Sequence, residues 1–182
     1  MKHFVASLAA AALAVGAGSA VAQNEMPFGS EHDVEYAELL WDAMESLNIA
    51  GEDRVTGLPY EGTQPHGMML ETFYTEATVD GHTGDLIVKN NYGPEGVTVD
   101  DVLSNPDNHL GAVTVMFRRE EGYDSENQDW FWVRYAADGS IANNPDGVPM
   151  AGRVAAGMDT GCIACHQGAA GDLVFTSDHL AE

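Results

Sequence analysis

The stretch that decides the fold is Met68–Tyr92, MMLETFYTEATVDGHTGDLIVKNNY, which holds two runs of β-forming residues on either side of a glycine-containing turn. The runs cover residues 68–79 and 86–92, and both carry the aromatic and β-branched side chains that favour strands. The segment Gly81–Gly84, GHTG, lies between them and is typical of a turn. The stretch therefore predicts an antiparallel hairpin near the middle of the chain.

An N-terminal helix, a short helix or turn and two further strands complete the predicted elements. Ser30, with Asp33 three residues later, is typical of a helix start, and apolar residues then recur at helical spacing through Glu31–Asn48 up to the C-cap candidate Gly51. The remaining elements are a short helix or turn and two strands, at Thr98–Pro106, Ala112–Arg119 and Asp129–Ile141. The predicted fold class is α+β, a small antiparallel β-sheet with an N-terminal helix and a C-terminal segment that carries both cysteines.

The first residues, MKHFVASLAAAALAVGAGSAVAQ, have the layout of an export signal. Lys2 precedes an apolar run, and small residues end it at Ala20-Val21-Ala22, which matches the A-x-A cleavage pattern. A membrane anchor is the alternative, but the run is short and rich in Ala and Gly. We therefore expect a signal peptide over residues 1–22, a single domain over residues 23–182, and no membrane attachment after cleavage.

The charge balance limits the partners. The chain has 29 acidic residues against 7 Lys and Arg, a formal net charge of −22. Such a surface repels nucleic acid and anionic membranes, so neither is expected as a partner. A solvated acidic surface on an exported protein is the simplest interpretation, and a basic redox partner is the alternative.

The segment Gly161–Gly168, GCIACHQG, holds both cysteines of the chain in a C-x-x-C-H sequence. The two thiols can each add to one vinyl group of haem, and the histidine can become an axial iron ligand. A redox-active dithiol usually follows a strand of a βαβ unit, and a zinc site requires further Cys or His nearby. The sequence around the motif offers neither context. The motif predicts one covalent haem c, held by Cys162 and Cys165, with His166 as metal ligand.

The motif does not indicate what lies on the other side of the iron. No methionine follows His166, and His179 is close to the C-terminus. The upstream candidates are Met68, Met69, Met116, Met150 and Met158, but methionines near strands are usually core residues. We therefore expect a five-coordinate iron with an open distal face, which binds small ligands. A protein sixth ligand, as in an electron-transfer cytochrome, is the alternative.

Lys89 is the only lysine after Lys2, and it follows three apolar residues in the second strand of the hairpin. Strand alternation puts it on the same face as Ile87 and Asn91, and both faces carry apolar residues. An unpaired ammonium there would cost several kcal/mol. Lys89 could extend to a strand end, pair with an acid or a haem propionate, or be held neutral as a nucleophile.

Together these blocks resemble the cytochrome P-460 family, which includes the related cytochromes c′-β. The resemblance runs roughly from His66 to Asp178 and is carried by HGMMLETFY, LIVKNNYG, AVTVMFRREEGYD, DWFWVRYAADG and GCIACHQG…LVFTSD. The helical cytochromes c′ also have a late C-x-x-C-H, but they are four-helix bundles, and the strand-rich middle argues against them. The resemblance implies a haem domain on a small antiparallel sheet, commonly a homodimer.

The resemblance also implies a function and a role for Lys89. Members of the P-460 type oxidise hydroxylamine to nitrogen oxides in the periplasm, and a lysine in a V-K-x-N-Y strand is bonded to their porphyrin rim. Lys89 matches that lysine in VKNNY. The expected protein is a periplasmic oxidoreductase that binds hydroxylamine or another small nitrogen oxide and passes electrons to a redox partner.

One departure concerns the proton acceptor. Hydroxylamine-oxidising members use a distal carboxylate, which by rough spacing should fall within Ala112–Phe117, and that segment has no acid. Thr114 or Met116 could face the haem there, so the catalytic residue is unknown. Four acids nearby in the sequence have no assigned place, Glu71, Glu76, Glu120 and Glu121.

The cytochromes c′-β supply the second functional interpretation. They lack the lysine link, cover the distal face with phenylalanine and bind nitric oxide without turnover. Three phenylalanines are candidates for such a cap, Phe73, Phe117 and Phe131. Three arginines are candidates to pair with haem propionates, Arg54, Arg134 and Arg153.

Overall fold

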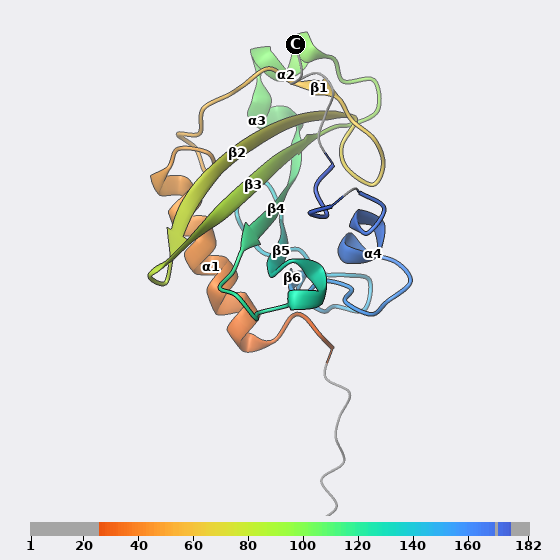
Figure 1. Ribbon diagram of the computed structural model, residues 1–182. Helices are drawn as coiled ribbons and strands as arrows, with labels where there is room; N and C mark the ends of the chain where they lie inside the picture. The colour runs from red at the N-terminus through yellow and green to blue at the C-terminus, as the bar shows by residue number, and fades with distance from the viewer. Residues whose placement is uncertain (1–25, 170, 176–182) are drawn as a thin grey trace, which may run out of the picture.

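The structure is a computed structural model, and it describes residues 26–169 and 171–175. Its centre is one six-stranded antiparallel sheet in which the strands follow chain order (Figure 1). The strands are β1 Tyr60–Glu61, β2 Met69–Val79, β3 His82–Tyr92, β4 Leu110–Arg118, β5 Trp130–Tyr135 and β6 Ala151–Gly152. The α+β prediction is confirmed. The expected signal peptide and His179 lie outside the described residues.

The β2–β3 hairpin forms as predicted, but its turn is earlier and tighter. Val79 pairs with His82, so only Asp80 and Gly81 connect the strands, with φ of 48° and 79°. Two positive φ values are typical of a type I′ turn, which Asp-Gly favours. The prediction of a turn over Gly81–Gly84 was wrong because the Asp-Gly pair, not the whole glycine-flanked segment, sets the register.

The N-terminal helix α1 covers Glu31–Ser46 and begins with the predicted cap. The Asp33 amide donates to Ser30 Oγ at 3.1 Å, and the Ser30 amide donates to Asp33 Oδ2 at 3.0 Å. This reciprocal pair satisfies two amides that the helix itself leaves free. The helix ends earlier than predicted, with Leu47 rather than Gly51 as its C-cap.

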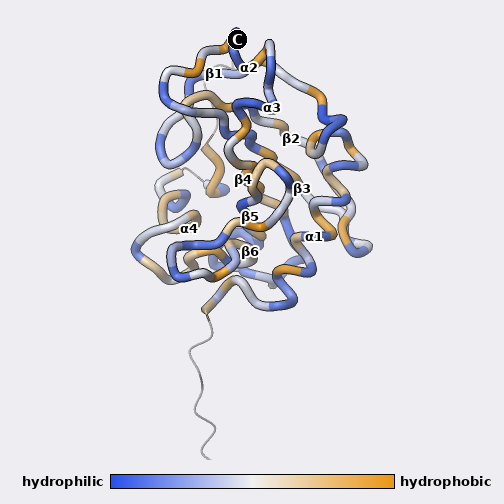
Figure 2. The backbone as a smooth tube through the Cα atoms, turned by 180° about the vertical axis from the view of Figure 1, so that it is seen from behind, coloured by the Kyte–Doolittle hydropathy of each residue, from blue (hydrophilic) through white to orange (hydrophobic). Residues whose placement is uncertain are grey.

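Strand alternation gives the sheet two covered faces. On one face, Leu86, Val88 and Phe117 pack with Leu40 and Met44 of α1 in the main core. The C-terminal segment, which contains α4 at Cys162–His166, lies on the other face (Figure 1). Seen from behind, α1 and α4 again lie on opposite sides of the sheet, and β4 and β5 carry apolar stretches between them (Figure 2).

Short elements connect these layers. The predicted helix or turn after Thr98 is two short helices, α2 at Val99–Ser104 and α3 at Pro106–His109. A 3-10 turn, η1, covers Ser125–Asn127 before β5. No helix in the described part of the chain is both long enough and apolar enough to cross a bilayer.

Candidate functional site: the cavity between the sheet and the C-terminal segment

A cavity of about 1120 Å³ separates the second face of the sheet from the C-terminal segment. The sheet contributes the alternate side chains that point away from α1, among them Lys89 from β3, Thr114 and Met116 from β4, and Trp132 from β5. The C-terminal segment contributes Cys162, Cys165, His166 and Phe175. The structure thus brings the predicted attachment residues and Lys89 to one cavity, although they are far apart in sequence.

The histidine of the C-x-x-C-H sequence is held in one tautomer. His166 is 9% exposed, and its Nδ1 lies 2.7 Å from the Leu173 carbonyl oxygen. A carbonyl can only accept, so Nδ1 carries the proton and Nε2 keeps a free lone pair. Metal-binding histidines usually donate their other N–H in this way, which orients the ring and raises its basicity. Trp132 and Phe175 pack edge-on against the imidazole, with centroids 4.7 and 5.3 Å away.

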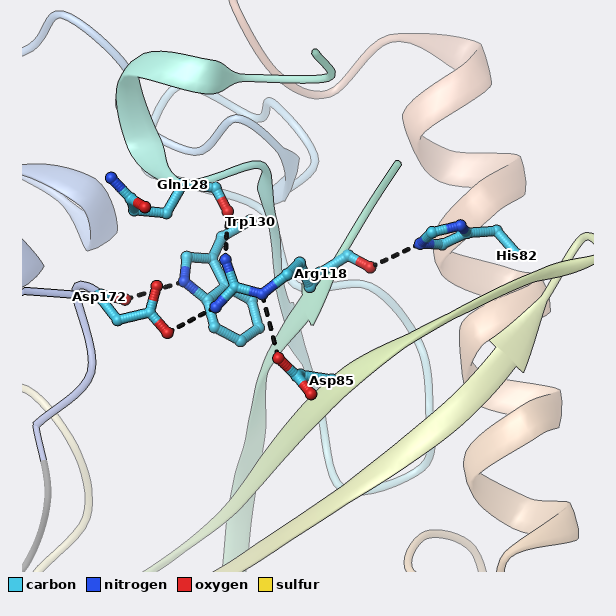
Figure 3. A network of polar contacts seen from close by, with 6 residues as sticks. All are labelled: His82, Asp85, Arg118, Gln128, Trp130 and Asp172. Carbon is cyan, nitrogen blue, oxygen red and sulfur yellow. Dashed lines mark hydrogen bonds and ion pairs between the residues drawn. The ribbon is translucent and has the colours of Figure 1, made fainter. Parts of the chain in front are cut away.

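A polar clamp holds the segment that supplies this carbonyl (Figure 3). Arg118, on β4, forms an ion pair with Asp172 at 2.5 Å and another with Asp85 at 3.1 Å. Its guanidinium stacks 4.1 Å above the ring of Trp130, whose Nε1 donates to the Asp172 carbonyl at 2.9 Å. Asp172 directly precedes Leu173, so the clamp fixes the backbone that orients His166.

Lys89 is partly buried and lies on the same face of β3 as Ile87 and Asn91, as strand alternation predicted, and this face lines the cavity. Among the described residues it forms no ion pair, because the four ion pairs found there all involve arginine. Burial lowers the pKa of its amine, which increases the neutral fraction. A neutral amine is a nucleophile. Of the roles that the sequence left open for Lys89, its environment therefore fits that of a nucleophile held neutral by burial.

Both thiols are free, and the thiol of Cys162 shows no sign of redox activation. Burial raises the pKa of Cys162 to about 11, so its thiol stays protonated at neutral pH. A dithiol catalyst requires the opposite, a thiol whose pKa is lowered. Within the described ranges, no group of three or more Cys, His, Asp and Glu could hold a metal ion by itself. The dithiol and zinc alternatives therefore find no support in these residues.

The cavity fits a covalently attached haem. Its walls combine apolar side chains with two thiols three residues apart, an imidazole with a free Nε2 and the cationic Arg134. The volume slightly exceeds the usual range for small-molecule pockets, which is about 300–1,000 Å³. Trp132 is 3% exposed, and its Nε1 has no hydrogen-bond partner within the described residues. An acceptor on a bound group would satisfy this buried donor.

Several other candidates from the sequence lie elsewhere. Phe117 and Phe131 belong to the core under α1, and Phe73 packs against that core, so none of them caps the cavity. The aromatic residue that does line it is Phe175. Arg54 pairs with Asp107 at 2.7 Å and Arg153 does not line the cavity, which leaves Arg134 as the propionate candidate.

The acids without an assigned place do not line the cavity either. Glu71 is 2% exposed and accepts from Asn90 Nδ2 and the Tyr92 hydroxyl, both at 2.8 Å, on the α1 side of the sheet. Glu120 pairs with Arg119 at 2.8 Å. Of the candidate methionines, Met68, Met116 and Met150 line the cavity, whereas Met69 is core and Met158 is exposed.

One cavity residue was missed by the sequence analysis. His66 lies in the loop before β2, and its Nδ1 is 3.0 Å from Asn91 Oδ1. Burial, with a contribution from Lys89, lowers the pKa of His66 to about 4, so the ring is neutral at pH 7. The available signal was its position at the start of the HGMMLETFY block, but a lone histidine in a loop gives no direction for its side chain.

Comparison with models of protein families, with characterised proteins and with solved structures finds no match to this chain. The resemblance to the P-460 family therefore rests on the motifs, and function must be argued from the cavity.

Proposed function

We propose that the chain is an exported mono-haem c protein of the cytochrome P-460 type, with haem in the cavity between the sheet and α4. Cys162 and Cys165 would form the two thioethers by adding S–H across the vinyl groups, a step that needs no oxidant. His166 would bind the iron through Nε2. The observation that carries the proposal is the hydrogen bond from His166 Nδ1 to the Leu173 carbonyl, because it prepares that nitrogen for a metal.

Lys89 would provide a third covalent anchor at the porphyrin rim. Its support is the position on the cavity wall together with a burial-lowered pKa. Replacing an amine N–H and a macrocycle C–H by one N–C bond releases two protons and two electrons, so the step requires an oxidant such as hydrogen peroxide. The link would distort the macrocycle and alter its electronics.

The substrate would be hydroxylamine or a related small nitrogen oxide. Haem iron would supply a binding site for the substrate nitrogen and accept its electrons, which then pass to a redox partner in the periplasm. Within this chain, Thr114 and Met116 line the cavity beside Lys89. The homodimer that the family resemblance implies stays a prediction.

Binding of nitric oxide without turnover is the second candidate, and the character of the cavity wall favours it. Only two acids, Glu61 and Glu95, are among the described residues that line the cavity, and both are exposed. Neither resembles a sheltered proton acceptor, which oxidation of hydroxylamine requires.

The two candidates are separated by a turnover assay. Purified haem-loaded protein is mixed with hydroxylamine and an artificial electron acceptor, and acceptor reduction is followed by absorbance. The oxidase proposal predicts steady reduction that is lost in His166→Ala. Nitric oxide binding with no acceptor reduction by the wild-type protein would leave the ligand-binding function and overturn the oxidase.

A further inference from the structure

The loop that carries His66 is held tightly against the sheet. The Gly62 amide donates to the Met68 carbonyl and the Met68 amide to the Tyr92 carbonyl, both at 2.8 Å. At Gly67 a Cβ atom would lie 2.5 Å from the Tyr92 backbone, so only glycine allows this approach. His66 therefore projects from a fixed loop rather than from a free one.

The tautomer of His66 is fixed by its neighbour. Asn91 is 6% exposed, and its Nδ2 donates to the carbonyls of Lys89 at 2.8 Å and Ala112 at 3.2 Å. Its Oδ1 must then be the acceptor that faces His66 Nδ1 at 3.0 Å, so this nitrogen carries the proton. His66 Nε2 keeps a free lone pair, and no partner for it is found in the described part of the chain.

The two cavity histidines are thus prepared in the same way. His166 donates from Nδ1 to a backbone carbonyl and His66 donates from Nδ1 to a buried amide oxygen, which leaves both Nε2 atoms free. Donation from the second nitrogen is the usual arrangement around a metal-bound histidine.

The distance between the rings matches a shared metal. Their centroids are 6.3 Å apart and their planes are inclined by 84°. Imidazoles bound on opposite sides of one first-row metal ion by bonds of about 2.0 Å have centroids roughly 6 Å apart, since each centroid lies about 1 Å behind its nitrogen. An ordinary stacked or edge-on contact needs no such preparation of both Nε2 atoms.

We propose that His66 is the sixth ligand of the haem iron in the resting protein, opposite His166. This inference rests on the haem assignment of the proposed function. It replaces the open distal face expected from sequence by a closed one, in which a small ligand must displace His66 before it binds. His66 would then limit access to the iron, and the rigidity of its loop would determine how readily another ligand displaces it.

The test is the spin state of the ferric haem-loaded protein, measured by electron paramagnetic resonance and optical absorption. We expect a low-spin signal in the wild type and a high-spin signal in His66→Ala. His32→Ala, an exposed histidine on α1, is the matched control and should stay low-spin. Cyanide should bind His66→Ala at least about tenfold faster, because the competing ligand is gone.

Two results would overturn the inference while leaving the haem assignment intact. One is a high-spin wild-type protein, and the other is a low-spin His66→Ala, which would point to a different sixth ligand. Absence of covalent haem, read from haem staining of a denaturing gel, would reject both the inference and the proposed function.

Discussion

A single backbone carbonyl, that of Leu173, determines which ring nitrogen of His166 is free to bind a metal. Because the Leu173 carbonyl accepts a hydrogen bond from Nδ1–H, the imidazole presents Nε2, and burial lowers the pKa of His166, which favours the neutral ring. Lys89 is selected in a similar way, since burial lowers its pKa and favours the reactive amine over the ammonium. At this scale, the surroundings of a side chain, and not its residue type alone, decide which atom and which protonation state it presents to the cavity.

The bond proposed for Lys89 can be tested by digestion with trypsin. If Lys89 is joined to haem, cleavage after it is blocked, because trypsin requires a free lysine side chain. Residues 55–118 should then remain linked through haem to residues 154–182. Lys89→Arg is the matched control and should release two separate peptides, 55–89 and 90–118, as should a wild-type protein without the link. Clean cleavage after Lys89 in haem-loaded wild type would exclude the bond.

The C-x-x-C-H sequence marked Cys162, Cys165 and His166, and the family resemblance added Lys89 to them. The local sequence could not predict His66, whose direction depends on Asn91, 25 residues away, and on the close approach of Gly67 to β3. The phenylalanine caps failed for a related reason. Strand alternation separates the two faces, but only the position of α1 shows which face is core.

Among the elements, β4 links the two layers through Arg118. This side chain joins the strand to Asp172 and thereby to the carbonyl that orients His166 (Figure 3). Asp172→Asn should weaken that link. The hydrogen bond from His166 Nδ1 to the Leu173 carbonyl would then be weaker, and the imidazole would be a less basic ligand. We therefore expect a higher haem reduction potential.

The control for the clamp is Asp85→Asn, which removes the other carboxylate on Arg118 but does not touch the C-terminal segment. Potentiometric titration of both variants should show a shift in Asp172→Asn and little change in Asp85→Asn. Equal potentials in both variants and the wild type would show that the clamp does not influence the iron ligand.

Helix α1 contributes stability from the face opposite the cavity. Leu40 is fully buried between α1 and the sheet, so Leu40→Ala should cost about 2–5 kcal/mol in the free energy of unfolding. The adjacent Leu39 is 45% exposed, and Leu39→Ala should cost much less. Chemical denaturation gives both values, and the haem absorption spectrum should be unchanged in each. A spectral change in Leu40→Ala would show that the two faces are coupled.

For the molecule as a whole, one small sheet packs a core on one face and lines a cavity on the other. The longer strands, β2 to β5, could be predicted because their side chains show a strand pattern in the sequence. Strands β1 and β6 are only two residues long and leave no periodic signal. The cavity could not be predicted, because it arises where the C-terminal segment folds back over the sheet, far from it in sequence.

The net charge of −22 leads to a prediction about electron transfer. Transfer to a small basic cytochrome should slow by about tenfold or more between 10 and 150 mM salt, because screening removes the long-range attraction. Stopped-flow mixing measures this rate, and an uncharged quinone acceptor is the control that should show little salt dependence. A salt-independent rate with the basic acceptor would argue against electrostatic docking.

The proposed function depends first on haem bound covalently at Cys162 and Cys165. The most direct measurement is mass spectrometry of the tryptic peptide 154–182 after denaturation and treatment with iodoacetamide. We expect a 154–182 peptide that carries one haem in Lys89→Arg, and the same peptide with residues 55–118 attached through the haem in the wild type, with both cysteines protected from alkylation. A peptide of bare mass with two alkylated cysteines, and haem recovered in an acid–acetone extract, would contradict it.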